Sequence, residues 1–156
     1  MRDSRITLIT AQPVTVSSDA TAFGATLDLK DGYVGDHWYG TGPYGLPVEF
    51  MVSTVVTGTG DGFTLVVGWQ DSEDGSNWDY NAECGTITFD TDGNILKKDG
   101  TTKLNLTRGK VSMRLRTARR YARLYWTSAG ITGGETVNVQ AWVSDGTKAF
   151  NDGVIY

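Results

Sequence analysis

VEFMVSTVVTGTGDGFTLVVGW (residues 48–69) holds two apolar runs on either side of a glycine-rich turn. Positions 48, 50, 52, 54 and 56 of the first run fall on one face of an extended chain, and positions 63, 65, 67 and 69 of the second do the same. This alternation, built from β-branched and aromatic side chains, is typical of strands. Because the turn reads Gly-Thr-Gly-Asp-Gly, the stretch predicts a hairpin of two antiparallel strands.

Short runs and turns continue in both directions from this stretch. Turn dipeptides recur at 31–32, 61–62, 74–75, 92–93, 99–100, 133–134, 145–146 and 152–153. Further strands are expected at 85–89, 94–97, 103–107, 111–115, 121–126 and 136–143. The pattern predicts an all-β fold, an antiparallel β-sandwich or jelly roll. The chain of 156 residues has the size of one domain, which we place at residues 21–156.

Residues 1–20 are predicted to form an N-terminal arm. Met1–Ser18 has little turn chemistry, carries Arg2 and Arg5, and contains the short apolar run Ile-Thr-Leu-Ile at 6–9. Extended segments of this kind can add to the edge of another sheet. We therefore expect the arm to order against a neighbouring subunit or a partner instead of completing its own core.

Positive charge is concentrated in one part of an acidic chain. The chain carries 14 Lys and Arg against 18 Asp and Glu, a formal net charge of -4. Eight of the basic residues and none of the acidic ones lie between Gly100 and Gly134. The basic residues there are Lys103, Arg108, Lys110, Arg114, Arg116, Arg119, Arg120 and Arg123. Such an asymmetry bears on partners and association more than on fold.

The densest part of this region is RTARRYARLYW, residues 116–126. As a strand it places Ala122, Leu124 and Trp126 on one face, and Tyr121, Arg123 and Tyr125 on the other. As a helix it would be a basic amphipathic segment, because apolar residues also recur at helical spacing. The Tyr and Trp content and the glycine-rich context favour the strand. Its arginines either contact a partner or pair with carboxylates of neighbouring strands such as Asp71, Glu73 and Asp74.

Motifs that would indicate an enzyme are absent from the sequence. The single histidine, His37, and the single cysteine, Cys84, lie in no local motif for nucleophilic catalysis. A Cys84–His37 dyad is the one nucleophilic pair available, and a buried structural cysteine is the simpler interpretation. Phosphate loops and paired-cysteine zinc patterns do not occur. We therefore expect no enzyme activity and no cofactor.

The acidic run DSEDGSNWD, residues 71–79, contains the carboxylate residues that a calcium-binding loop needs. Aligning Gly75 with the glycine of an EF-hand loop puts Gln70 first and Asn81 last, where Asp and Glu are required. A looser site using Asp71, Glu73, Asp74 and Asp79 stays open as an alternative. A solvated turn between two strands explains the same residues more simply, so no metal is expected.

The sequence also predicts where the protein folds. Its first residues lack the apolar run of a signal peptide, and no later stretch has the length of apolar sequence that a membrane helix needs. One cysteine excludes an intrachain disulfide, which fits a reducing cytoplasm. We expect a soluble protein that does not act at a membrane, and we give no weight to the glycosylation motif at residues 105–107.

Three separated segments carry a resemblance to a known family. The turn Ser-x-Asp-Gly-x-x-Trp at 72–78 (SEDGSNW) is followed by Arg-Tyr-x-Arg-Leu-Tyr at 120–125 (RYARLY) and preceded by Ala-x-x-Asp-Leu at 25–29 (ATLDL). With the final segment ITGGETVNVQAWVSD at 131–145, this resembles the jelly-roll capsid cement, or decoration, proteins of tailed bacteriophages. The aromatic, glycine-rich stretch at 31–45 departs from that pattern.

The resemblance implies a virion structural protein made in the bacterial cytoplasm. It would be a homotrimer that binds the outer surface of an expanded icosahedral capsid and stabilises contacts between subunits of the major capsid protein. Interface energy concentrates in Arg, Tyr and Trp. The candidate partner-binding residues are Arg2, Arg5, Arg116, Arg119, Arg120, Tyr121 and Arg123.

Two other classes of function remain as alternatives. A carbohydrate-binding β-sandwich, such as a virion adhesin or lectin-like module, would stack sugars on the aromatic residues between Tyr33 and Tyr44. A nucleic-acid-binding protein would stack bases on Tyr121, Tyr125 and Trp126. The acidic net charge disfavours nucleic acid, because phosphates are repelled at long range.

Overall fold

The computed structural model describes residues 2–9, 14–29, 33–34, 37–38, 46–55, 62–104, 108–132 and 134–144. These residues form strands and turns, and no helix long and apolar enough to cross a membrane occurs among them. The strands are β1 (Arg2–Thr7), β2 (Val14–Val16), β3 (Thr21–Phe23), β4 (Leu27–Asp28), β5 (Tyr33–Val34), β6 (His37–Trp38), β7 (Leu46–Val55), β8 (Phe63–Ser72), β9 (Asp79–Phe89), β10 (Ile95–Leu96), β11 (Arg108–Leu115), β12 (Tyr121–Ala129) and β13 (Thr136–Ser144).

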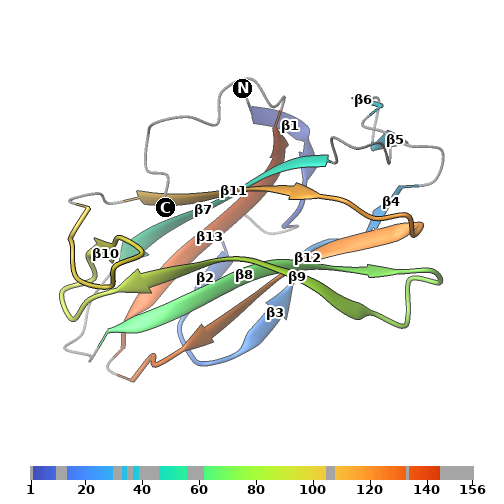
Figure 1. Cartoon of the computed structure of the whole chain (residues 1–156). Coiled ribbons are helices and arrows are strands. Elements are labelled where there is room, and N and C mark those ends of the chain that lie inside the picture. Colours follow the sequence, from blue (N-terminus) through green and yellow to red (C-terminus); the bar gives the residue numbers. More distant parts are fainter. Residues whose placement is uncertain are drawn as a thin grey trace.

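Two antiparallel sheets pack face to face as a sandwich (Figure 1). The five-stranded sheet has the order β1-β13-β7-β11, with β2 also paired to β13. The six-stranded sheet has the order β10-β9-β8-β12-β3, with β4 also paired to β12. Strands β5 and β6 form a separate two-stranded hairpin. The all-β antiparallel sandwich predicted from the sequence is confirmed.

The pairing of strands is nested along the chain. The first strands, β1 and β2, pair with the last, β13, and β3 and β4 pair with β12. Inside these pairs, β7 binds β11 and β8 binds β9. This is the arrangement of a jelly roll, a long antiparallel hairpin rolled into two sheets.

The predicted hairpin of residues 48–69 is wrong, although both of its strands exist. β7 and β8 belong to different sheets: β13 and β11 flank β7, whereas β12 and β9 flank β8. The alternation predicted the inward face correctly, because Val48, Phe50 and Val52 and, in β8, Phe63, Leu65, Val67 and Trp69 are buried. Alternation fixes the face that a strand buries and carries no information about its neighbours.

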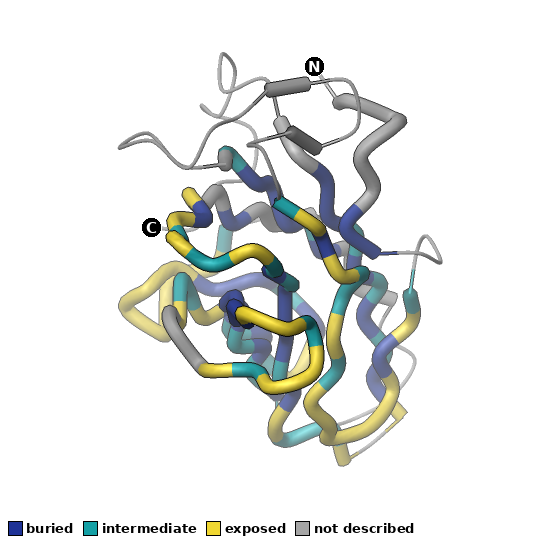
Figure 2. The backbone as a smooth tube through the Cα atoms, turned by 90° about the vertical axis from the view of Figure 1, so that its right-hand side faces the viewer, coloured by how far each residue is buried: buried dark blue, intermediate teal, exposed yellow. Residues whose placement is uncertain are grey.

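The core lies between the sheets, and the turns lie at the surface (Figure 2). Phe50 of one sheet contacts Trp126 of the other, with ring centroids 5.9 Å apart. Phe63 stacks on Phe89 at 4.3 Å. Large side chains of both inner faces therefore fill the sandwich.

Part of the segment predicted to be a detached arm lies in the chain's own sandwich. β1 and β2 run along β13, and Leu8, Ile9 and Val16 are buried in the core. Leu8 is 1% exposed. The alternation of this segment is too short to distinguish a core strand from an arm, and its pairing partner lies at the other end of the chain. For residues 2–9 and 14–16 the predicted arm that leaves its own core is therefore corrected to edge strands of the five-stranded sheet.

Because Gly24 has no side chain, the loop between β3 and β4 can approach the backbone of Leu8 closely. A Cβ atom built on Gly24 would lie 2.3 Å from the backbone oxygen of Leu8. The same oxygen accepts a hydrogen bond of 2.7 Å from the Ala25 N–H, and the Gly24 N–H donates to the Leu124 oxygen. The loop between β3 and β4 thus joins the segment after β1 to β12.

Most of the remaining strand predictions are confirmed, and one lies largely outside the described residues. Residues 85–89, 111–115, 121–126 and 136–143 lie within longer strands, and 94–97 contains the short β10. At 103–107 only the bridge from Lys103 to Leu96 is present in the described part, since residues 105–107 lie outside it. The alternative helix at 116–126 is wrong: a turn precedes β12, and Ala122, Leu124 and Trp126 are buried as the strand pattern predicts.

Candidate functional site

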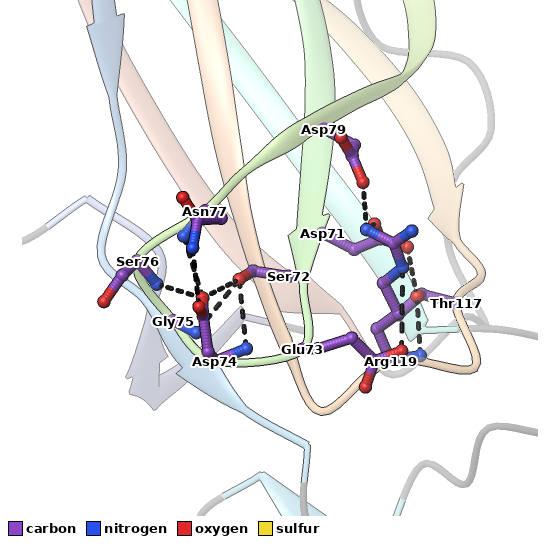
Figure 3. A network of polar contacts seen from close by, with 10 residues as sticks. All are labelled: Asp71, Ser72, Glu73, Asp74, Gly75, Ser76, Asn77, Asp79, Thr117 and Arg119. Carbon is purple, nitrogen blue, oxygen red and sulfur yellow. Dashed lines mark hydrogen bonds and ion pairs between the residues drawn. The ribbon is translucent and has the colours of Figure 1, made fainter.

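The turn at residues 72–78, between β8 and β9, is held by two side chains (Figure 3). The Ser72 hydroxyl accepts hydrogen bonds from the Asp74 and Gly75 N–H groups. Oδ1 of Asp74 accepts the N–H groups of Ser76 and Asn77, each at 2.8 Å, and Oδ2 accepts the Asn77 side-chain amide at 2.7 Å. Gly75 has φ +75°, a conformation that favours glycine. Hydrogen bonds within the turn therefore define its conformation.

This bonding stabilises the charged form of Asp74. The N–H groups of Asn77 and Ser76, the Asn77 amide and the Ser72 hydroxyl hold the pKa of Asp74 well below its ordinary value. Three other aspartates that bind backbone N–H groups at turns, Asp19, Asp90 and Asp99, also have lowered pKa values. For Asp90 partial burial acts to raise the pKa, but hydrogen bonds from Lys103, Asn94 and Asp92 outweigh it and lower the pKa to about 2.

We expect these aspartates to make the protein sensitive to acid. A carboxyl whose pKa is lower in the folded state than in the unfolded state stabilises the fold above its unfolded pKa, and this contribution is lost as the pH falls through the folded pKa. Unfolding in urea should therefore require less denaturant between about pH 4 and pH 2, with little change between about pH 5 and pH 7. Asp74→Asn should reduce the pH dependence in that acid window. A flat urea midpoint down to about pH 2 would contradict the lowered pKa values.

Arg119 joins three carboxylates beside the turn (Figure 3). Its Nη1 lies 3.3 Å from Oδ1 of Asp71 and also bonds Asp79, while its Nε lies 3.8 Å from Glu73. Thr117 donates its hydroxyl proton to Asp71 and accepts the Arg119 N–H at 2.9 Å. The hydrogen bond to Asp79 and the three negative charges raise the pKa of Arg119 despite some desolvation. The segment that precedes β12 is thereby fastened to β8 and β9.

Arg120 forms a bidentate pair with Asp28 of β4. Its Nε and Nη2 donate to the two carboxylate oxygens at 3.0 and 2.8 Å. The guanidinium also lies 4.9 Å from the centroid of the Tyr121 ring. Both partners of the ion pair are 45% exposed, so solvent screens the pair and its contribution to stability is modest.

Arg123 lies between two aromatic rings. Its guanidinium carbon is 4.0 Å from the centroid of Phe23 and 4.1 Å from that of Trp78, and its Nε donates to Gln70 at 2.9 Å. Gln70 is 2% exposed, and Phe23 is 42% exposed. A cation enclosed by two rings and a buried amide holds β3, β12 and the turn together.

Exchanging Arg123 for Gln should lower the free energy of unfolding by about 1–2 kcal/mol, because both cation–π contacts and a hydrogen bond to the charged group are lost. Chemical denaturation measures the change. Arg116→Gln is the matched control, since Arg116 is exposed, and it should stay within about 0.5 kcal/mol of the parent. If instead Arg123→Gln folds as stably as the control and fails only in partner binding, the side chain serves an interface.

Three of the four segments that carry the family resemblance meet at one place, whereas the fourth, at 131–145, contains β13 of the other sheet. Tyr121 of β12 is paired with Asp28 on one side and with Ser72 on the other, so the segments at 25–29, 72–78 and 120–125 share one row of the six-stranded sheet. The N–H of Leu29 donates to the Arg120 oxygen at 2.7 Å. Gly75 lies against the Tyr121 ring, since a Cβ built on it would be 3.5 Å from the ring. We call this arrangement the motif cluster.

The candidate partner-binding residues divide into two sets. Arg120, Tyr121 and Arg123 belong to the motif cluster and Arg119 directly precedes it, and each of these arginines has a partner within the chain. Arg116 is exposed just before it. Arg2 and Arg5 lie in the edge strand β1, and their side chains lie outside the described part. Of the intramolecular pairs considered from the sequence, those with Asp71 and Glu73 occur with Arg119, whereas Asp74 holds the turn.

Sequence reasoning missed the residues that complete the motif cluster from other strands. Asp28, Gln70 and Phe23 were assigned no role. Asp28 lies in one of the three motif segments, which is the one signal that pointed toward it. Gln70 was detectable as a polar residue that continues the strand predicted at 63–69. Phe23 has no signal in the sequence, because its contact with Arg123 depends on the pairing of β3 with β12.

The carboxylates proposed as a loose calcium site have other partners in the structure. Arg119 binds Asp71, Glu73 and Asp79, and Asp74 binds the turn. Across the described ranges, no group of three or more His, Cys, Asp and Glu residues is arranged to hold a metal ion. One arginine, Arg119, therefore offsets part of the negative charge of these carboxylates.

The structure tests only part of the hypotheses of a Cys84–His37 dyad, a sugar-binding platform and base stacking. Burial raises the pKa of the half-buried Cys84 thiol, which opposes formation of the nucleophilic thiolate. The side chain of His37 and most of the stretch at 31–45 lie outside the described residues, so the dyad and the sugar platform stay untested predictions. Trp126 and Tyr125 are 2% and 7% exposed, which leaves little ring surface for stacking on bases.

Comparison with known proteins identifies no family. No protein-family model matches the sequence, and no curated protein matches it significantly.

Proposed function

We propose that this protein is a capsid cement protein of a tailed bacteriophage, a jelly-roll subunit that binds the outer surface of an expanded shell and ties neighbouring capsid subunits together. The observation that supports the proposal most is the motif cluster. Three of the four segments that carry the resemblance are short and far apart in the sequence, and any one of them could arise by chance. In the structure they share one row of a sheet and contact one another, so the likeness concerns a single structural unit.

The fold agrees with this proposal. The resemblance implies a jelly roll, and the chain has the nested pairing of that fold. Because jelly rolls also occur in lectins and other proteins, the fold adds support only together with the motif cluster.

The proposed mode of action is multivalent binding by a closed ring of subunits. A cyclic trimer presents the same surface three times, so weak contacts at a symmetric junction add up through high effective concentration. Such a protein binds only where the lattice presents all contacts at the right spacing, which explains how it would distinguish an expanded shell from its precursor. Arg2, Arg5 and Arg116 are proposed contacts to the shell or to a neighbouring subunit.

The deciding experiment is co-sedimentation with capsids. The purified protein should pellet with expanded, undecorated phage capsids and stay in solution with unexpanded procapsids. Light scattering coupled to gel filtration should give about 51 kDa, three times the chain mass of 16.9 kDa. A mass near 17 kDa together with no co-sedimentation would overturn the proposal.

A further inference from the structure

Threonine side chains gather on the outward face of the six-stranded sheet. β9, β8, β12 and β3 are neighbours in this sheet, and their cross-strand pairs place the outward residues in three rows (Figure 1). The first row is Phe23, Tyr125, Gly68 and Glu83, the second is Thr21, Thr127, Val66 and Thr86, and the third is Ala129, Thr64 and Thr88. We call this set the threonine face.

The register of the strands shows that the threonine face points away from the core. Leu65 of β8 and Leu124 of β12 are buried between the sheets, so the alternate positions of these strands lie on the outward face. Phe23, Thr21 and Thr86, on the two outer strands, are exposed. The face is therefore accessible in the single chain.

The threonine face is nearly uncharged. Glu83, at one corner, is its one charged residue, although the whole chain carries 14 basic and 18 acidic residues. Charge returns directly beyond the face, because Arg123 is the next outward residue of β12 and Asp28 lies in the row after that. A face of this kind does not select a partner of opposite charge. It is the place where two copies of a chain with net charge -4 meet with little repulsion.

Threonine hydroxyls can also bond to the same residues of a second copy, because each hydroxyl both donates and accepts a hydrogen bond. Thr21 and Thr127 form such a pair within the chain, with 2.8 Å between their hydroxyl oxygens. A contact between two identical faces requires this property, since a residue near a two-fold axis meets its own counterpart. An arginine or an aspartate in that position would meet a like charge.

We propose that the threonine face binds a second copy of this chain, face to face about a two-fold axis that passes near Thr127 and Val66. These two residues are direct cross-strand partners in the middle of the central row. Near the axis the hydroxyl meets a hydroxyl that can bond to it, and the valine meets an apolar side chain. The inference goes beyond capsid binding and does not depend on it.

The size of the threonine face predicts a weak contact. Neighbouring strands are about 4.8 Å apart and alternate residues of a strand about 6.7 Å apart, so four strands and three rows cover about 400 Å² on each copy. A stable interface buries about 800 Å² on each partner. Pairing through this face should therefore depend on the protein concentration.

A solvated face is the competing explanation. Threonine is common in strands because β-branched side chains suit a pleated surface, and it needs no partner there. Under that explanation the mass of the protein in solution does not respond to changes in this face. Substitutions within the face and outside it therefore separate the two explanations.

The test compares two matched substitutions. Thr127→Lys puts a charge in the middle of the threonine face, where it would meet the same charge of a second copy. Thr15→Lys is the control, because Thr15 is exposed in β2 of the other sheet and also makes one cross-strand hydrogen bond, to Asn138 at 2.8 Å. Both variants have the same net charge and lose one hydrogen bond. Thr86→Lys, at an exposed position of the threonine face, is a second variant that does not depend on the folding of Thr127→Lys.

Sedimentation equilibrium over a wide range of protein concentrations measures the pairing. The mean mass of the parent should rise toward twice that of the smallest species, whether that species is the chain of 16.9 kDa or a ring of three. Thr127→Lys and Thr86→Lys should pair at least about tenfold more weakly, and Thr15→Lys within about twofold of the parent. In the parent, backbone amide signals of β8 and β12 should shift with concentration more than those of β2 and β13.

A parent mass that stays constant with concentration would overturn the inference and identify the face as a solvated surface. Equal losses of pairing in Thr127→Lys and Thr15→Lys, or amide shifts confined to the other sheet, would overturn it as well. Capsid binding is a separate result. A parent that pairs through this face but does not co-sediment with expanded capsids would contradict the proposed function and leave this contact in place.

Discussion

Gly24→Ala is expected to lower the free energy of unfolding by about 3 kcal/mol, since the new methyl group overpacks a site bounded by backbone. The added Cβ would lie 2.3 Å from the Leu8 oxygen, well inside van der Waals contact. The obstacle is a main-chain atom that also accepts the Ala25 N–H, so relief of the clash costs a hydrogen bond or moves the segment after β1. Equilibrium unfolding in urea measures the effect.

Gly85→Ala is the matched control for this substitution. A Cβ on Gly85 would lie 3.2 Å from Cγ1 of Val111, a side-chain atom that can move by a few tenths of an ångström. The loss should be below about 1 kcal/mol. Equal stability of Gly24→Ala and the parent would mean that Leu8 does not pack against the β3–β4 loop in solution, which would restore the detached arm.

Leu8→Ala should cost a similar amount, about 3 kcal/mol, for a different reason. The side chain is 1% exposed within the core, so its truncation removes buried apolar surface and leaves a cavity. Thr15→Ala is the control within the same segment: Thr15 is exposed, and its loss removes one surface hydrogen bond to Asn138. It should cost less than about 1 kcal/mol.

The outcome also decides how the N-terminal segment is used. An unchanged melting temperature for Leu8→Ala combined with loss of oligomers would show that the segment packs on a neighbouring subunit. A loss of stability that does not depend on protein concentration would show that it packs on its own chain.

Local pattern predicted which residues are buried, but not which strands pair. The alternation in 48–69 identified the inward faces of β7 and β8, since burial follows directly from residue type and the two-residue period. Pairing depends on contacts between distant segments, such as β1 with β13, and short-range turn chemistry suggested a hairpin that the nested order replaces. The N-terminal segment was misassigned for the same reason.

The candidate site was predictable to a similar degree. The residue types in 116–126 indicated a strand, and pairing of its arginines with carboxylates of 71–79 was one of the two interpretations that the sequence left open. Phe23 and Gln70 escaped notice because they reach Arg123 only after β3 and β8 have flanked β12.

The nested pairing also determines when this protein can fold. β13 lies between β1 and β7, so the strand that joins the two halves of the five-stranded sheet is residues 136–144, which follow the other strands of that sheet in the sequence. During synthesis, β1 and β7 leave the ribosome before β13, the strand with which both of them pair. Their apolar side chains lack that neighbour until residues 136–144 have been made. Contacts between such distant segments close slowly because a long loop loses its freedom first. The five-stranded sheet can therefore form completely only after residues 136–144 have been made, and a chain that still lacks them is the form most exposed to aggregation.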